Sequence, residues 1–140
     1  MPTPVWMLLA FAAWTVVLLT ATVGLYRWSQ ILGGRVPING FTASPAEGAD
    51  WYRRAMRAHA NCLENLPVFA SIVLALHVTQ LDSTTVTCLS IAITVARVLQ
   101  SLVHVVLTQT PLVATFRFAF FFAQVVCFLS LVSLIVAHAT

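Results

Sequence analysis

Three stretches of the sequence carry no charged residue for long enough to cross a lipid bilayer, and this limits the folds open to the chain. They are residues 1–26, 98–116 and 118–140. About 20 residues of helix span the ~30 Å hydrocarbon layer. A fourth apolar stretch, 65–81, reaches that length when the amphipathic turns before it are included. Because only helices and closed barrels satisfy their backbone inside lipid, the sequence predicts an all-α, integral membrane four-helix bundle.

Turn-forming residues separate the four predicted helices. We predict one transmembrane domain over 1–140, with helices at 4–32, 50–81, 84–107 and 112–137. Gly33 and Gly34 end the first helix, and residues 35–48, which include two prolines, form the one sizeable loop. Asp50 is the expected N-cap of the second helix, and residues 82–85 turn the chain and cap the third. Such short turns make the last three helices antiparallel neighbours.

The basic residues predict the orientation in the membrane. All seven are arginines, and five lie between the end of the first helix and the first half of the second: Arg27, Arg35, Arg53, Arg54 and Arg57. By the positive-inside rule, the long loop and the turn around Pro111 are cytoplasmic, with both termini on the other side. Arg53 and Arg54 are expected to be solvated or to reach lipid headgroups. No exposed basic surface remains for a nucleic acid. The basic residues are all arginine and none is lysine, which favours a bacterial protein, and we therefore expect it in the inner membrane.

Polar residues nevertheless recur at helical spacing within these apolar helices. On the second helix they follow i, i+4, i+8 and i+11, namely Arg53, Arg57, Asn61 and Glu64. On the third they follow i, i+3, i+4, i+7 and i+11, namely Arg97, Gln100, Ser101, His104 and Thr108. The fourth adds Arg117 and Gln124. Ionisable residues inside a membrane are costly and mark functional sites by default.

These polar stripes have two interpretations. Glu64 can pair with Arg97 in a buried ion pair that fixes the helix register, which leaves Arg57 and Arg117 unexplained. Alternatively, the groups bind a small zwitterion with two carboxylates and an ammonium group, because arginine clamps carboxylates in a bidentate fashion.

Arginine can also promote ionisation of a bound thiol. Lowering a thiol pKa of ~8.5 by ~2 units requires ~2.7 kcal/mol. One guanidinium at ~4 Å supplies ~4 kcal/mol at an effective dielectric of 20. The chain's own thiols, Cys62, Cys88 and Cys127, fall within predicted helices, where they are expected to pack as small apolar residues and to form neither disulfides nor a metal site.

Residues 57–69, RAHANCLENLPVF, resemble the RAxxNxxE…PxF signature of the MAPEG family, the membrane-associated proteins of eicosanoid and glutathione metabolism. The resemblance extends over nearly the whole chain, with four helices, a loop after the first and an arginine midway through the third. It implies a homotrimer that binds glutathione, as co-substrate, between neighbouring subunits near the cytoplasmic face. Members conjugate glutathione to lipophilic electrophiles or reduce lipid hydroperoxides.

Carried over by position, the resemblance implies specific site residues. Those expected to bind glutathione are Arg35, Arg57, Asn61, Glu64, Arg97, Gln100 and His104. Gln100 and His104 stand where well-known members carry tyrosine or histidine. In those members the arginine that stabilises the thiolate begins the fourth helix, where this chain has residues 112–114, LVA. Arg117 lies one turn deeper on the same helix face and is the candidate catalytic residue.

Two further function classes remain beside the enzyme. The missing tyrosine and the displaced arginine are compatible with a catalytically silent family member, a scaffold that holds a lipid or a larger membrane complex. A transporter or channel is disfavoured, because the sequence has no inverted repeat.

Overall fold

The computed structural model describes residues 1–41 and 48–140, and it has the all-α architecture that the sequence predicts. Its elements are α1 (Thr3–Leu18), the π-helical segment η1 (Leu19–Gly24), α2 (Leu25–Leu32), α3 (Asp50–Val78), α4 (Thr84–Val106) and α5 (Pro111–Ala139). With α1, η1 and α2 counted as one continuous helix, four helices of the described chain are long and apolar enough to cross a membrane.

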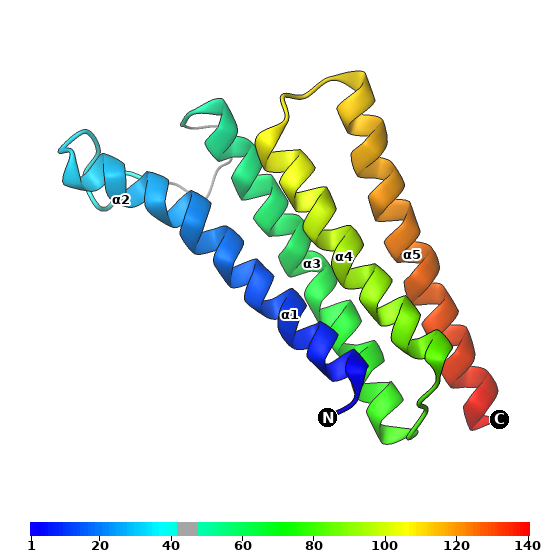
Figure 1. Cartoon of the computed structure of the whole chain (residues 1–140). Coiled ribbons are helices and arrows are strands. Elements are labelled where there is room, and N and C mark those ends of the chain that lie inside the picture. The colour runs from blue at the N-terminus through cyan, green and yellow to red at the C-terminus, as the bar shows by residue number, and fades with distance from the viewer. Residues whose placement is uncertain (42–47) are drawn as a thin grey trace.

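Both chain termini lie at one end of the bundle, beside the α3–α4 turn (Figure 1). The end of α2, the start of α3 and the α4–α5 turn lie at the opposite end, which we call the arginine-rich end because it carries Arg27, Arg53 and Arg54. Toward this end α2 diverges from the other helices, and none of its residues is buried. The arrangement brings together the two connections that the charge pattern assigns to the cytoplasm.

Local side-chain caps explain where α4 and α5 begin. Ser83 accepts a hydrogen bond from the Val86 backbone N–H at 3.2 Å, and Thr110 accepts one from the Val113 N–H at 3.2 Å. Each satisfies one of the backbone donors that a helix N-terminus leaves free. Pro111 occupies the first turn of α5, where its missing N–H costs nothing.

The ends of α3 differ slightly from the sequence prediction. Ala49 is the N-cap, and Asp50 is the first helical residue, where its charge still favours the helix N-terminus. At the other end the helix stops at Val78, three residues before the predicted boundary. Gln80 adopts a left-handed φ of 53°, and the Leu81 N–H donates to the Leu76 carbonyl at 3.1 Å. This turn satisfies the terminal carbonyls of α3.

The π-helical segment inside the first membrane span was not anticipated from the sequence. Within and beside it, the Thr20 hydroxyl donates to the Val16 carbonyl at 2.9 Å, and the Thr22 hydroxyl donates to Leu18. Threonine hydroxyls that bond back to the preceding turn tend to bend helices, and π-bulges are recognised sites of such bends.

The core is narrow, and many large apolar side chains are exposed on the outer helix faces. Aromatic rings from three helices meet in it. The Phe69 ring of α3 lies 5.8 Å from Phe11 of α1 and 6.1 Å from Phe128 of α5, between ring centroids. This contact joins the first and last membrane spans through α3.

Candidate functional site

The polar stripe of α4 faces the interior of the bundle. Arg97, Gln100, Ser101 and His104 are all buried, whereas Thr108 lies beyond the end of the helix and is exposed. Arg97 is only 1% exposed, and its guanidinium lies 5.7 Å from the centre of the Phe11 ring. Its Nε and Nη2 atoms have no hydrogen-bond partner among the residues that the structure describes. The stripe therefore places an unpaired cation on an aromatic ring inside the membrane span.

The ion pair between Glu64 and Arg97 that the sequence allowed is not formed. In the part of the chain that the structure describes, both ion pairs involve Asp50. The Arg97 guanidinium lies over the Phe11 ring of α1, whereas the Glu64 side chain of α3 is exposed. The first interpretation of the stripes is thus wrong for this pair.

The polar residues of α3 lie on the outside of the chain. Arg57 and Glu64 are exposed and Asn61 is half-buried, while Ala58 and Cys62 occupy the core face of the same helix. We call Arg57, Asn61 and Glu64 the outer polar face. Charges exposed on a membrane-spanning helix require a polar environment that this chain alone does not provide.

A cavity of about 270 Å³ lies between α3, α4, α5 and the α4–α5 turn. It is lined by Asn61, Gln100, Gln109, Ala114, Arg117, Phe118 and Phe121, and we call it the Arg117 cavity. It brings together three of the eight predicted site residues, Asn61, Gln100 and Arg117, from three different helices. Its lining combines four polar side chains with two phenylalanines and an alanine, so the cavity suits a ligand with both kinds of surface.

Arg117 is held at this cavity by two glutamines. Its Nη1 atom donates to Gln109 Oε1 at 2.8 Å, and its backbone carbonyl accepts a hydrogen bond from Gln100 Nε2 at 3.1 Å. Its Nε atom is buried without a partner. A guanidinium has five N–H donors, and the bond to Gln109 uses one of them, so the terminal nitrogens retain donors for a ligand oxygen or sulfur. Gln109 was missed from the sequence because it reads as an ordinary turn residue before Pro111.

The other predicted site residues do not line the cavity. Arg35 is exposed beyond α2, and Arg97 and His104 are buried. His104 nevertheless lies within electrostatic range of Arg117, Arg57 and Arg54, and Arg57 is close enough to Arg117 to repel it. Positive charge thus converges on this region from α3 and α5, which favours anionic ligands.

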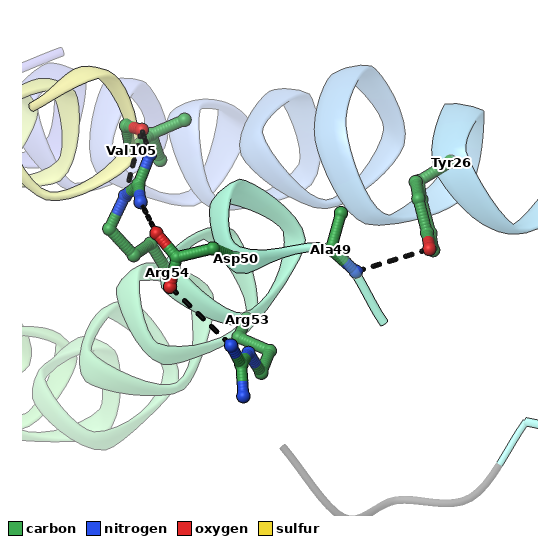
Figure 2. A network of polar contacts seen from close by, with 6 residues as sticks. All are labelled: Tyr26, Ala49, Asp50, Arg53, Arg54 and Val105. Carbon is green, nitrogen blue, oxygen red and sulfur yellow. Dashed lines mark hydrogen bonds and ion pairs between the residues drawn. The ribbon is translucent and has the colours of Figure 1, made fainter. Parts of the chain in front are cut away.

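A second network of polar contacts lies at the arginine-rich end (Figure 2). Asp50 pairs with Arg54 and, at 3.6 Å, with Arg53, and the Ala49 N–H donates to the Tyr26 hydroxyl at 3.2 Å. Arg54 also donates to the Val105 carbonyl at 3.4 Å. These contacts join α2, α3 and α4.

Arg54 corrects one expectation from the sequence. Its side chain is only 11% exposed, so it is not the solvated group that its position suggested. The last carbonyls of α4 lack helical donors, and the Arg54 guanidinium supplies one to Val105. Arg53, with 41% of its side chain exposed, agrees with the expectation.

The fold and its polar groups define a class, the multi-pass membrane proteins built as a four-helix bundle with a polar site inside the membrane. A model of the MAPEG family matches residues 4–137, and the chain therefore belongs to the MAPEG family. No curated protein and no solved structure matches the sequence. Membership associates the chain with the membrane proteins of glutathione and eicosanoid metabolism.

Proposed function

We propose that the protein is a membrane-bound, glutathione-dependent transferase or peroxidase. It takes glutathione, or a related small thiol, from the cytoplasm, and it takes a lipophilic electrophile or a lipid hydroperoxide from the bilayer. The observation that carries this proposal is the Arg117 cavity, where three side-chain amides and the Arg117 side chain line one space together with two phenylalanines.

The chemistry of the available side chains fits a thiol tripeptide. Glutathione carries two carboxylates, one ammonium group, two peptide amides and one thiol. Arg57 and Arg35 would bind the carboxylates, Glu64 the ammonium group and Asn61 an amide. The buried Arg97 would contribute through its charge and the buried His104 through its shape, both behind the contacting groups, and Gln100 would form part of the wall.

We further propose that the site is completed in a homotrimer. Arg57 and Glu64 are exposed on a membrane-spanning helix, and a neighbouring copy would shield them from lipid and share the ligand between subunits. The arginine-rich end would face the cytoplasm of a bacterial cell, with the trimer in the inner membrane.

Arg117 would promote ionisation of the thiol, whose proton passes to water. For conjugation, the thiolate sulfur attacks the electrophilic carbon, a carbon–sulfur bond forms, and the leaving group departs with the bonding electron pair. For reduction, the thiolate attacks the terminal oxygen of the hydroperoxide, and the O–O bond breaks. The alkoxide takes a proton from water, and the resulting sulfenic acid reacts with a second glutathione to give the disulfide and water.

One observation favours the alternative of a catalytically silent scaffold. The described cavity wall contains neither tyrosine nor serine, and Gln109 already occupies one donor of Arg117. A silent protein would hold a lipid or a larger membrane complex without thiol-dependent turnover.

Turnover by the purified protein decides between the two. The protein is assayed in lipid nanodiscs with a chromogenic aryl halide and with a lipid hydroperoxide, each with and without glutathione. We expect glutathione-dependent product, lost in Arg117→Ala and kept in His138→Gln, which lies at the other end of the bundle. Wild-type protein that binds glutathione without turnover of either substrate would favour the scaffold. An unchanged rate in Arg117→Ala would refute the role given to that residue.

A further inference from the structure

A short ladder of amides connects α4 to α5 beside the Arg117 cavity. Gln124 is fully buried, and its Nε2 atom donates to Gln100 Oε1 at 3.0 Å and to the Phe120 carbonyl at 2.9 Å. Gln100 in turn donates from Nε2 to the Arg117 carbonyl at 3.1 Å. The Gln100 side chain of α4 is therefore hydrogen-bonded to α5 at two points that lie two turns apart.

The orientation of this ladder has a single good solution. With its nitrogen toward Gln100, Gln124 donates to two oxygens, and its own Oε1 is left without a partner. If the Gln124 amide were flipped, its oxygen would lie against Gln100 Oε1 and the Phe120 carbonyl oxygen, and neither of these could donate to it. The two donated hydrogen bonds therefore fix the orientation of the Gln124 amide, although its own oxygen has no partner among the described residues.

We propose that Gln124 is a positioning residue for Arg117 and that it acts through Gln100. The inference rests on the proposed function of Arg117. Gln100 and Gln124 set how far α5 slides and turns against α4, and thereby where the guanidinium lies relative to a bound thiol. Gln109, which belongs to the turn, then holds the tip of the side chain.

The remaining surface between these helices supplies little positional information. In the chain outside 42–47, the two side-chain hydrogen bonds that join α4 to α5 both involve Gln100. Many of the other α5 side chains are apolar, and α5 carries five phenylalanines from Phe116 to Phe122. In lipid, apolar helix faces have no hydrophobic preference for one another over the acyl chains, so directional contacts determine the register.

A small displacement of Arg117 would have a measurable effect. If the guanidinium moves from ~4 to ~5 Å from a thiolate, their attraction falls by about a fifth at an effective dielectric of 20. That loss corresponds to roughly fourfold less thiolate at a pH below the thiol pKa. Complete removal of the cation would cost about 1000-fold by the same conversion.

The test measures the ultraviolet absorbance of bound glutathione thiolate at one fixed pH, at saturating glutathione, in the intact protein in nanodiscs. The variants are Gln124→Met, Arg117→Met and the double variant. Thr94→Val is the matched control, because Thr94 is also buried and bonds across helices, to the Met7 carbonyl at 3.2 Å, but does not line the cavity.

We expect about fourfold less thiolate in Gln124→Met, the wild-type amount in Thr94→Val, and no additional loss in the double variant beyond Arg117→Met. A normal thiolate signal in Gln124→Met, or losses that multiply in the double variant, would overturn the positioning role. A normal signal in Arg117→Met would instead overturn the proposed function of Arg117. Circular dichroism and size-exclusion profiles of each variant separate these results from misfolding, and Gln124→Glu, which keeps the side-chain length, provides a second variant if Gln124→Met does not fold. Gln124→Glu is then combined with Arg117→Met. A thiolate signal in this double variant equal to that of Arg117→Met alone supports the proposal, and losses that multiply refute it.

Discussion

The buried Arg97 leads to a prediction about stability. Within residues 1–41 and 48–140, two of its nitrogen atoms, Nε and Nη2, have no partner, and each unmade hydrogen bond of a buried donor costs about 1–3 kcal/mol. The contact with the Phe11 ring returns about 2 kcal/mol. We therefore expect Arg97→Met, which keeps most of the side-chain volume, to stabilise the folded protein by about 2 kcal/mol. Replacing buried charges with apolar side chains has this effect in other proteins.

The measurement is unfolding of the purified protein by sodium dodecyl sulfate in mixed micelles, followed by circular dichroism. Arg54→Met is the matched control, because Arg54 is also largely buried but has partners in Asp50 and the Val105 carbonyl. We expect the control to be less stable than the wild type by about 1–2 kcal/mol. Arg97→Met should at the same time bind glutathione more weakly, because costly intramembrane charges are retained for function.

The reasoning about Arg97 is refuted if Arg97→Met lowers stability as much as Arg54→Met. Such a result would mean that the Arg97 guanidinium has partners in the assembled protein. If Arg97→Met and the wild type were equally stable, the unmade hydrogen bonds of Arg97 would cost only as much as its contact with the Phe11 ring contributes.

Three further predictions follow from local geometry. Gly48→Ala should destabilise the protein by at least ~1 kcal/mol in the same unfolding assay, because Gly48 has a φ of +96° and a new Cβ would lie 2.6 Å from the Tyr52 ring; an unchanged midpoint would contradict this. Ser83→Ala should cost ~1 kcal/mol through loss of the cap on Val86, whereas Ser83→Asp should not. Arg57→Met should weaken glutathione binding at least ~10-fold in calorimetry, through loss of a charged hydrogen bond; wild-type affinity would remove Arg57 from the site.

The fold was predictable because its determinants are local in sequence. The uncharged stretches fix the number of membrane spans, and Ser83 and Pro111 mark two helix starts by their own backbone chemistry. The π-helical segment was not predictable, since Leu19–Gly24 reads as an ordinary apolar stretch of helix. The early end of α3 depends on the left-handed conformation of Gln80, at a position where glycine is the usual signal.

The site was less predictable, because it depends on how each helix is rotated against its neighbours. Periodicity shows that polar residues share one face of a helix, but not which neighbour that face meets. The stripe of α4 faces inward, so Arg97 meets Phe11 and not Glu64. Gln109 and the bond between Gln100 and Gln124 are contacts between segments, and no sequence spacing announces them.

The most direct test of the whole account is a high-resolution map of the protein in lipid with saturating glutathione. We predict density for the tripeptide in the Arg117 cavity, with its sulfur within hydrogen-bonding distance of the Arg117 guanidinium and its carboxylates toward the outer polar face of α3. Density for glutathione elsewhere on the bundle, or an Arg117 cavity filled by lipid alone, would contradict the account.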